Sequence, residues 1–435
     1  MDTCSNYIDL PLGKGVNAHW HPTNRYKTLR FDLMLRHQLL RCDNTRVALI
    51  GRLCERGTSS MPDMRSLNCY IDDLYGAYFS AEVGRIGDQQ LIHLCIEVLD
   101  ERFVDPGTHG DVLRRAGDFM RQVIADPLRD GQGYKRSYFD QEKRSLILQA
   151  ESLYNDKIAY SQWRCAEEMG RGTAWGLSHW GSPDDLEGIG TDDLWRFHQQ
   201  LLAQNPIDIF ISGHIERDLA MAMCEQVLAW PRRPIPSLDP PVALMGKSKT
   251  RELFEMQDIV QSKLILGYDT GIGMRSEEYA AQILFNMTWG SDAQSQLFRR
   301  LREGLGLCYY IDSHIDSLAG IIYTSAGIEA GDYSHVLNEI ELELENIQKG
   351  GVALGDLLNA KKLLTSRLVA MADDREALMR LRMRGIVAGV SCNPSELVQQ
   401  LEAVEPEQVW EIAEKMKLRT IYFLHGGQQE GRRRT

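Results

Sequence analysis

The 435-residue chain has 43% apolar and 25% charged residues, an ordinary globular composition that is too long for one domain of roughly 100–200 residues. Its formal net charge of −12 argues against nucleic-acid binding, which needs an excess of lysine and arginine, and the sequence shows neither a membrane span nor a secretion signal. Nine scattered cysteines without a Cys-x-x-Cys pair are typical of reduced thiols, so we expect a cytoplasmic, multi-domain protein without a membrane partner.

The first half of the sequence predicts, in chain order, a hairpin, a helix and a strand. The segment 74–79 leads into partly alternating residues up to Val98, and the turn Gly87-Asp88 within them indicates an antiparallel hairpin covered on one face. A helix over 195–202 follows an acidic turn, as helix dipoles prefer, and leads into a strand over 207–214.

A proline-rich segment, 231–241, lies near the middle of the sequence. Proline fixes φ and removes a backbone donor, so this segment can continue neither a helix nor a central strand. We predict an N-terminal domain over 1–230, a linker over 231–241 and a C-terminal domain over 242–435.

The second half repeats the order of the first. The segment 305–310 precedes a strand pair that ends near Glu329, a long helical pattern follows over 336–344, and a helix over 410–416 leads into a strand over 420–426. Because the two correspondences occur in the same order, we infer a duplicated unit. The predicted fold class is α+β, with two homologous domains that each pack helices on a mostly antiparallel sheet.

Motifs for hydrolysis or nucleotide binding are absent from the sequence. The eleven histidines form neither His-x-x-Glu-His nor its inverse, and there is no Gly-x-Ser-x-Gly elbow, Walker loop or dinucleotide fingerprint. His19 and His21 share one face of a strand, but no nearby carboxylate completes a ligand set, so we interpret them as exposed strand histidines.

A polar corner stands out in the second half. A helix ends in an arginine cluster over 299–302, and a glycine turn at Gly306 delivers Tyr309 and Tyr310 to the start of a strand. This corner could aim a guanidinium and a phenol at a peptide carbonyl. The residues alone favour the plainer interpretation, in which the charges end a helix and the tyrosines pack in a core.

The sequence resembles the pitrilysin/insulinase peptidases over nearly its whole length. The run Ser295-x-Leu297-Phe298-x-x-Leu301-Arg302-Glu303-x-x-Gly306-Leu307-x-Tyr309 is similar to the C-terminal signature of that family. Three further segments of this sequence resemble landmarks in the first domain of that family: Gly57-Thr58, Leu74-Tyr75-Gly76-Ala77 and Phe139-x-x-Glu142-Lys143. The stretch 151–157, with Gly176-Leu177-Ser178 and Gly181, is similar to the YfmF-like branch of non-catalytic bacterial members. The resemblance implies an insulinase/mitochondrial-processing-peptidase-like fold.

The resemblance also implies a degenerate zinc site. Counting back from the Gly-Thr pair, the family's His-x-x-Glu-His positions fall at Ala48, Gly51 and Arg52, and the third ligand falls at Gln149. Glu151 is the nearest carboxylate, but its offset is wrong. Alanine and glycine lack ligand atoms, and a guanidinium cannot lose its proton to bind zinc. We therefore expect no cofactor in this chain and zinc in a partner subunit.

Two-chain members of the family divide the site between their subunits. One subunit supplies zinc, and its partner supplies an arginine and a tyrosine that match Arg302 and Tyr309, with Tyr310 as the fallback. The resemblance thus implies a non-catalytic subunit that forms a heterodimer with a zinc-bearing homologue and helps to cleave peptides, including leader peptides. The alternative is an inactive scaffold that supports modification of a translation elongation factor. An autonomous peptidase is the third possibility.

Overall fold

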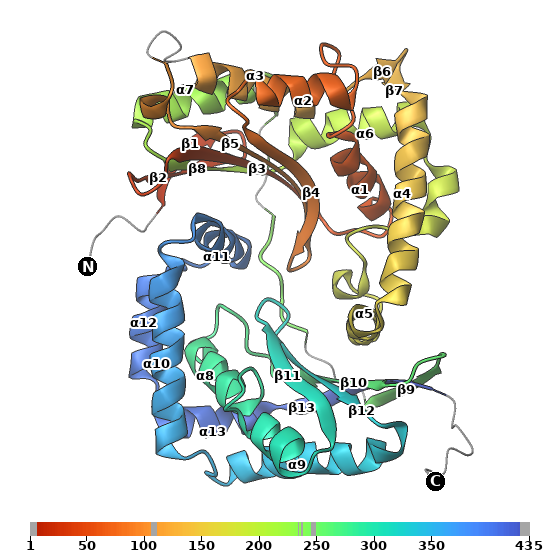
Figure 1. Ribbon diagram of the computed structural model, residues 1–435, viewed down its shortest axis with the longest axis vertical. Coiled ribbons are helices and arrows are strands. Elements are labelled where there is room, and N and C mark those ends of the chain that lie inside the picture. Colours follow the sequence, from red (N-terminus) through yellow and green to blue (C-terminus); the bar gives the residue numbers. More distant parts are fainter. Residues whose placement is uncertain (1–6, 106–110, 234, 236–237, 245–248, 427–435) are drawn as a thin grey trace. The chain divides into compact units, whose positions relative to one another are not determined.

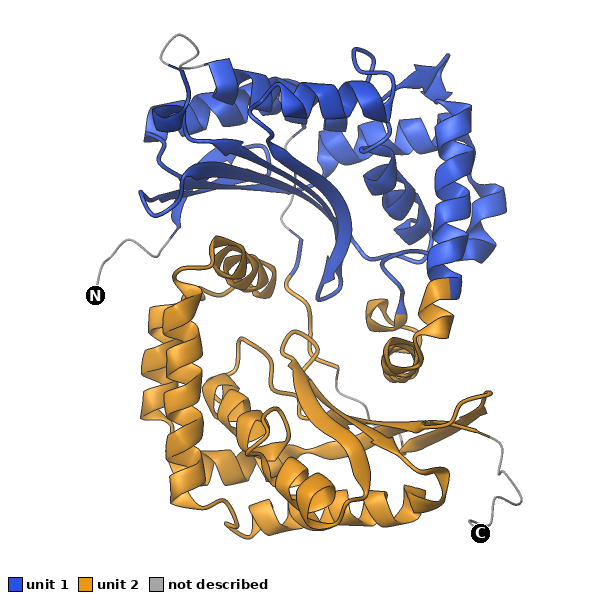
Figure 2. Cartoon of the chain, in the orientation of Figure 1, with its two compact units in different colours: residues 1–151, 177–239 blue, residues 152–176, 240–435 orange. Residues whose placement is uncertain are grey.

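The computed structural model describes residues 7–105, 111–233, 235, 238–244 and 249–426. The chain divides into two compact units (Figures 1 and 2): unit 1 is residues 1–151 and 177–239, and unit 2 is residues 152–176 and 240–435. The predicted linker over 231–241 includes residues 234, 236 and 237, which lie outside the described residues, and it stays a prediction. No helix in the described part of the chain is long and apolar enough to cross a membrane.

Unit 1 contains a six-stranded sheet with the order β1-β2-β8-β3-β5-β4. Its strands are β1 (Ile8–Gly13), β2 (Val16–Pro22), β3 (Thr28–Gln38), β4 (Tyr78–Ile86), β5 (Gln89–Leu99) and β8 (Ile207–Gly213). The predicted hairpin is β4 and β5, which turn at Gly87 with φ of +63°. Strands β2 and β8 are parallel, and the other pairs of this sheet are antiparallel.

Helices cover one face of this sheet (Figure 1). They are α1 (Asn44–Leu53), α2 (Met64–Asp72), α3 (Asp111–Ala125), α4 (Arg136–Asn155), α6 (Thr191–Gln204) and α7 (Arg217–Val227), and the short strands β6 (Arg129–Asp130) and β7 (Gly133–Tyr134) precede α4. Alternate residues of β3, such as Phe31 and Leu33, meet apolar helix residues such as Val47 and Ile50 in one core. Since side chains alternate along a strand, Arg30 and Asp32 lie on the opposite face.

Unit 2 contains a five-stranded sheet with the order β11-β12-β10-β13-β9. Its strands are β9 (Arg251–Met256), β10 (Ser262–Asp269), β11 (Cys308–Asp316), β12 (Ile321–Ile328) and β13 (Lys417–His425). Read from β9 to β11, this order matches β2-β8-β3-β5-β4 of unit 1, including the single parallel pair, which is β9 with β13. The duplication and the α+β fold class predicted from the sequence are confirmed.

The helices of unit 2 include one from early in the sequence. They are α5 (Lys157–Met169), α8 (Tyr279–Trp289), α9 (Tyr333–Gln348), α10 (Leu354–Met371), α11 (Arg375–Ala388), α12 (Pro394–Ala403) and α13 (Pro406–Lys415). Helix α5 packs on β10 and β13, where Tyr160 donates a hydrogen bond to Glu255 of β9 at 3.0 Å. The sulfur of Met169 fills the space above Gly267 on β10.

Candidate functional site

Three of the four positions predicted to be a degenerate zinc site line one pocket in unit 1, which we call the α1–α4 pocket. Its volume is about 380 Å³. The pocket is lined by Ala48, Arg52, Glu55, Arg56, Ala81, Glu82, Val83, Glu142, Ser145, Gln149 and Trp180. Ala48 and Arg52 lie one turn apart on α1, and Gln149 reaches them from α4. The structure therefore brings Ala48, Arg52 and Gln149 together.

Charged side chains form one wall of this pocket. Arg52 donates a hydrogen bond from Nη2 to Oε1 of Gln149. The Glu142 side chain, only 2% exposed, accepts a hydrogen bond from Nε of Arg56 at 2.5 Å, and its other oxygen lies 3.8 Å from Nη1 of Arg52. A buried carboxylate is thus held between two guanidinium groups, and one of these belongs to Arg52, a position predicted for a zinc-binding histidine.

The residues present do not fit zinc. Ala48 has no donor atom, and Arg52 presents a permanent cation that is already hydrogen-bonded to Gln149. At Gly51, an added Cβ would lie 2.3 Å from Cγ2 of Val83 on β4, so the Val83 side chain must shift to admit one there. Glu151 is exposed and does not line the pocket. Among the described residues, no group of three or more His, Cys, Asp and Glu side chains could hold a metal ion.

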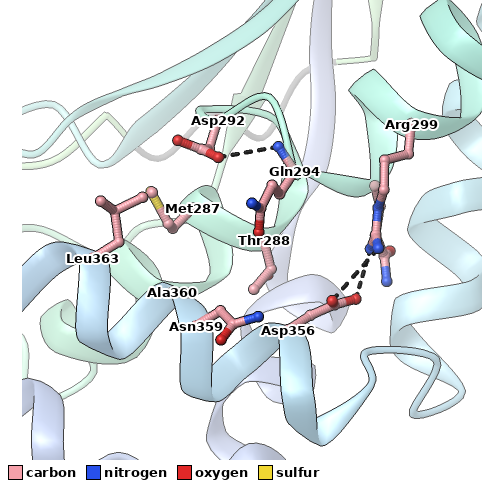
Figure 3. Close-up of a pocket in the computed structure, with 10 residues that line it drawn as sticks. Met287, Thr288, Asp292, Gln294, Arg299, Asp356, Asn359, Ala360 and Leu363 are labelled. Carbon is pink, nitrogen blue, oxygen red and sulfur yellow. Dashed lines mark hydrogen bonds and ion pairs between the residues drawn. The ribbon is translucent and has the colours of Figure 1, made fainter.

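A smaller pocket lies in unit 2 between α8 and α10 (Figure 3). Its volume is about 30 Å³, which is room for little more than a water molecule. Its polar groups bond to one another: Nη2 of Arg299 lies 2.6 Å from Oδ2 of Asp356, and Asp292 accepts from the backbone N–H of Gln294 at 3.0 Å. Because the space holds little more than a water molecule, we assign no ligand to this pocket.

The interpretation of His19 and His21 as exposed residues is wrong. Both are buried, at 3% and 2% exposure. His19 lies between two carboxylates, with Nδ1 2.7 Å from Asp9 and Nε2 2.9 Å from Asp208. Burial by itself lowers the pKa of His19, but the hydrogen bonds to Asp208 and Asp9 outweigh it, so this pKa is raised above its ordinary value. These partners come from β1 and β8, so sequence spacing did not indicate them.

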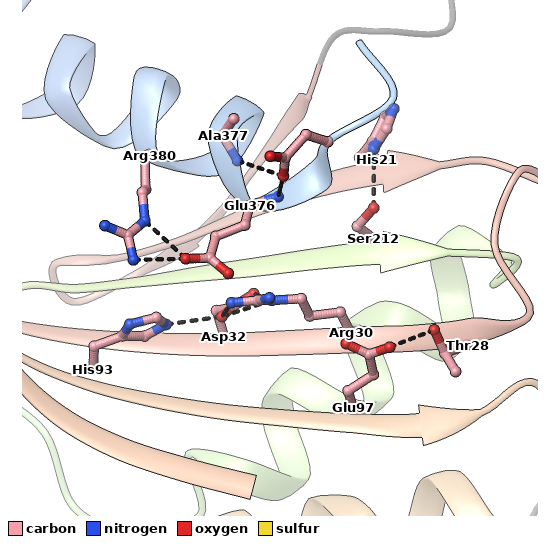
Figure 4. Close-up of polar contacts among 11 residues, drawn as sticks. His21, Thr28, Arg30, Asp32, His93, Glu97, Ser212, Glu376, Ala377 and Arg380 are labelled. Atoms are coloured by element: carbon pink, nitrogen blue, oxygen red, sulfur yellow. Dashed lines mark hydrogen bonds and ion pairs between the residues drawn. The ribbon is translucent and has the colours of Figure 1, made fainter. Parts of the chain in front are cut away.

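Similar buried polar contacts continue across this face of the unit 1 sheet (Figure 4). Asp32 on β3 lies between Nε of Arg30 at 2.9 Å and Nε2 of His93 on β5 at 2.8 Å, and Nδ1 of His21 lies 3.0 Å from Oγ of Ser212. Burial raises the pKa of Asp32, yet its hydrogen bonds to His93 and Arg30 produce a net lowering. The charges on this face are thus paired within the sheet and support it.

The arginine cluster of unit 2 divides into paired and unpaired members. Arg299 forms an ion pair with Asp356 on α10 at 2.6 Å, and Arg300 forms one with Glu339 on α9 at 3.1 Å. Arg302 lies in the π-helical segment η6 (Phe298–Gly304) and is exposed. Its Cζ lies 4.7 Å from the ring centroid of Phe298, and within the described part of the chain it forms no ion pair. Its guanidinium therefore keeps its donors available.

Tyr309 lies on a β-bulge at the start of β11, a strand that packs against η6. Cys308 is opposite Ile328 and Tyr310 is opposite Gly327, which leaves Tyr309 as the extra residue. Such bulges re-aim side chains and occur often beside active sites. Tyr309 is 56% exposed, and its hydroxyl donates a hydrogen bond to Oε1 of Glu329.

The neighbouring Tyr310 has a different environment. Its ring packs on Gly327, where an added Cβ would lie 2.4 Å from the ring atom Cε1. Burial raises the pKa of Tyr310, and within the described part of the chain its buried hydroxyl has no hydrogen-bond partner. Of the two predicted tyrosines, Tyr309 is therefore the accessible one.

Comparisons with known proteins show which proteins share this fold. Residues 188–364 match the family model described as Peptidase M16 inactive domain. A conserved protein from Enterococcus faecalis V583 superposes with a TM-score of 0.90 at 25% identity, covering 98% of this chain and all of the other. The peptidase M16 inactive domain from Pseudomonas fluorescens has the same fold, with a TM-score of 0.80 at 16% identity over 98% of this chain and 100% of that one. Over residues 188–364 the chain is thus similar to the inactive domain of M16 peptidases, and it shares the fold of that domain.

Two curated proteins are similar to this chain in sequence. Over 412 residues, 95% of this chain and 96% of the relative, it is 26% identical to the probable inactive metalloprotease YmfF of Bacillus subtilis (strain 168). It is 24% identical over 170 residues, 38% of this chain and 41% of the relative, to the uncharacterized zinc protease YmxG of the same organism. The resemblance to the pitrilysin/insulinase-type peptidases is thus confirmed, and the branch described above as YfmF-like corresponds to YmfF.

Sequence reasoning missed several features of these two sites. The ion pair of Arg56 and Glu142 is one of them, because Arg56 lies in the turn after α1 and Glu142 lies 86 residues further along the chain, on α4. The π-helical turn at Arg302 and the bulge at Tyr309 depend on the register of η6 and β11 against their neighbours. No local sequence signal marks that register.

Proposed function

We propose that this chain is the non-catalytic subunit of a heterodimeric zinc metallopeptidase, in which it supplies Arg302 and Tyr309 to the site of a zinc-bearing homologue. The observation that supports this proposal most strongly is that the side chains of Arg302 and Tyr309 in unit 2 are exposed. Arg302 is exposed and forms no ion pair among the described residues, whereas Arg299 and Arg300 are both paired. Tyr309 stands on a bulge that exposes its phenol.

The side chains of Arg302 and Tyr309 are suited to assisting catalysis by a partner subunit rather than to hydrolysis by this chain. When a zinc-bearing subunit attacks a peptide bond, the carbonyl oxygen becomes negative, and the Tyr309 hydroxyl can donate a hydrogen bond to it. A single donor of this kind is worth about 3–4 kcal/mol of the activation barrier. The guanidinium of Arg302 can hold the same carbonyl or its neighbour. The hydroxyl must first turn away from Glu329, its present acceptor.

Peptides, including leader peptides, are the proposed substrate class. An extended peptide can add to the edge of a sheet, where backbone hydrogen bonds give affinity with little sequence selectivity. Both sheets have such an edge, β4 in unit 1 and β11 in unit 2. The similarity to relatives named as zinc proteases supports a peptide substrate.

The test mixes this chain with a zinc-bearing homologue from the same genome and measures peptide cleavage. Tyr309→Phe should slow cleavage by about two orders of magnitude, as expected for the loss of an oxyanion donor, and Arg302→Ala should lower kcat/KM. Arg299→Ala is the matched control, because it removes an arginine of the same segment that is already paired with Asp356. Cleavage at the wild-type rate by both variants would show that the assisting role is wrong.

The ion pairs in the α1–α4 pocket favour the alternative function, that of an inactive scaffold. They are compatible with a scaffold that binds a partner, for example during modification of a translation elongation factor, without any part in proteolysis. Gel filtration against candidate partners distinguishes the two functions. A stable complex that contains neither zinc nor peptidase activity supports the scaffold.

A further inference from the structure

We propose that Tyr310 is a positioning residue, which anchors the bulge at the start of β11 and so keeps the phenol of Tyr309 exposed for catalysis. Lys263 on β10 is the second part of this anchor, because its ammonium lies over the ring of Tyr310. The inference rests on the proposed function and deepens it by adding two residues that act through Tyr309. It gives Tyr310 a different role from the substrate-binding fallback predicted from the sequence.

The bulge reconciles the sequence of β11 with the core of unit 2. Cys308 and Ile311 both belong to that core, although they are three residues apart and side chains at an odd spacing point to opposite faces of a regular strand. The extra residue, Tyr309, restores the alternation, so that both side chains can face the core. Tyr310 then lies on the opposite face of the sheet, where its partner on β12 is Gly327.

On that face the ring of Tyr310 fills a place that a glycine leaves open. Gly327 pairs with Tyr310 on one side and with Lys263 on the other, so the three residues form one row across β11, β12 and β10. An added Cβ at Gly327 would lie 2.4 Å from Cε1 of the Tyr310 ring. The ring therefore occupies the space of the missing side chain, and Tyr309 cannot enter that space while the ring is there.

Lys263 holds the ring from the other end of this row. The residue is 7% exposed, and within the described part of the chain it forms no ion pair. Its Nζ donates to Oε1 of the neutral Gln261 and lies 5.4 Å from the ring centroid of Tyr310. Buried ammonium groups ordinarily have a charged partner, and here the negative face of the ring can offset the charge. Since the Tyr310 hydroxyl has no hydrogen-bond partner among the described residues, the ring provides the anchor.

The first experiment needs no partner subunit. Tetranitromethane nitrates exposed tyrosines of the full-length chain, and mass spectrometry that resolves single residues measures the rate at Tyr309. Tyr78 is the internal reference, because both tyrosines are 56% exposed. In Tyr310→Ala the Tyr309 ring can move onto Gly327, so its nitration should slow several-fold relative to Tyr78. Tyr310→Phe keeps the ring and should restore the wild-type rate.

A second variant tests the anchor if Tyr310→Ala fails to fold. Lys263→Met removes the ammonium but keeps the length of the side chain, and it should also slow nitration of Tyr309, by less than Tyr310→Ala. Lys362→Met is the matched control, because it makes the same change at an exposed position on α10 of unit 2, and it should nitrate like the wild type. Wild-type nitration of Tyr309 in both Tyr310→Ala and Lys263→Met overturns the inference.

The second experiment measures peptide cleavage in the mixture with the zinc-bearing homologue. Tyr310→Ala should lower kcat by about 10- to 100-fold with little change in KM, as expected when a catalytic group is displaced by about 1 Å. Adding Tyr310→Ala to Tyr309→Phe should cause no further loss, because Tyr310 acts through Tyr309, and a further loss would overturn the inference. Slow nitration in Tyr310→Ala, together with wild-type cleavage by Tyr309→Phe, would refute the proposed function and still support the anchoring of Tyr309.

Discussion

Replacing Glu142 by glutamine should destabilise unit 1 through the wall of the α1–α4 pocket. The wild-type carboxylate is 2% exposed and holds Arg56 at 2.5 Å, with Arg52 at 3.8 Å. Removing one partner of a buried ion pair costs about 3–5 kcal/mol when the remaining charge cannot escape. Here the arginines are 24% and 20% exposed, and both can turn partly toward water. We therefore expect a loss of about 2–3 kcal/mol, below that range.

Differential scanning calorimetry measures this effect directly. For a unit of this size, a loss of about 2–3 kcal/mol lowers Tm by about 4–12 °C. Glu151→Gln is the matched control, because it makes the same chemical change at an exposed position of the same helix, outside the pocket. A double-mutant cycle with Arg56→Gln should give a coupling energy of about 1 kcal/mol or more. Equal Tm values for the Glu142 and Glu151 variants would refute the reasoning.

Three further predictions concern the metal positions, the buried histidine and the second tyrosine. The combined change Ala48→His, Arg52→His and Gln149→Glu should create a site that binds zinc stoichiometrically, measured by metal analysis, and equal zinc content in the wild type would contradict it. The raised pKa of His19 means that its contribution to stability is fully present below the unfolded pKa near 6.5 and is lost as pH rises through the higher folded value. The free energy of unfolding in urea should be measured for the wild type and for His19→Asn at pH values from below 6.5 upward. The difference between the two should fall as pH rises, and a difference that does not change with pH would contradict the prediction. Gly327→Ala should cost about 1–3 kcal/mol by overpacking, because the new Cβ would lie 2.4 Å from a ring atom of Tyr310, and thermal unfolding as stable as the wild type would show that the ring moves freely.

The fold could be predicted because its two halves carry the same signals in the same order. The strand predicted over 207–214 is β8 and the strand predicted over 420–426 is β13, and both occupy the same place in their sheets. The turn at Gly87 also marks its hairpin correctly. These features rest on local turn chemistry and apolar patterning, which a sequence displays directly.

The pocket positions could be predicted because helical spacing is regular. Ala48 and Arg52 differ by four residues and therefore share a face of α1, and the offset from Glu142 placed Gln149 on the facing side of α4. The burial of His19 could not be predicted in this way. Its two carboxylate partners are ten and 189 residues away in sequence, and only the pairing of β2 with β1 and β8 brings them together.

The position of α5 has a consequence for how this polypeptide can be divided. The helix is encoded ahead of the last helices and strand of unit 1, yet it forms part of the layer that covers β10 and β13. A fragment that starts at the proline-rich stretch would lack this cover and would present apolar side chains such as Ile265 and Leu424 to water. Separately expressed halves should therefore be poorly soluble unless the second fragment also carries residues 152–176. During translation, α5 leaves the ribosome before the strands of unit 2 have been synthesised, so it cannot pack on β10 and β13 until they follow.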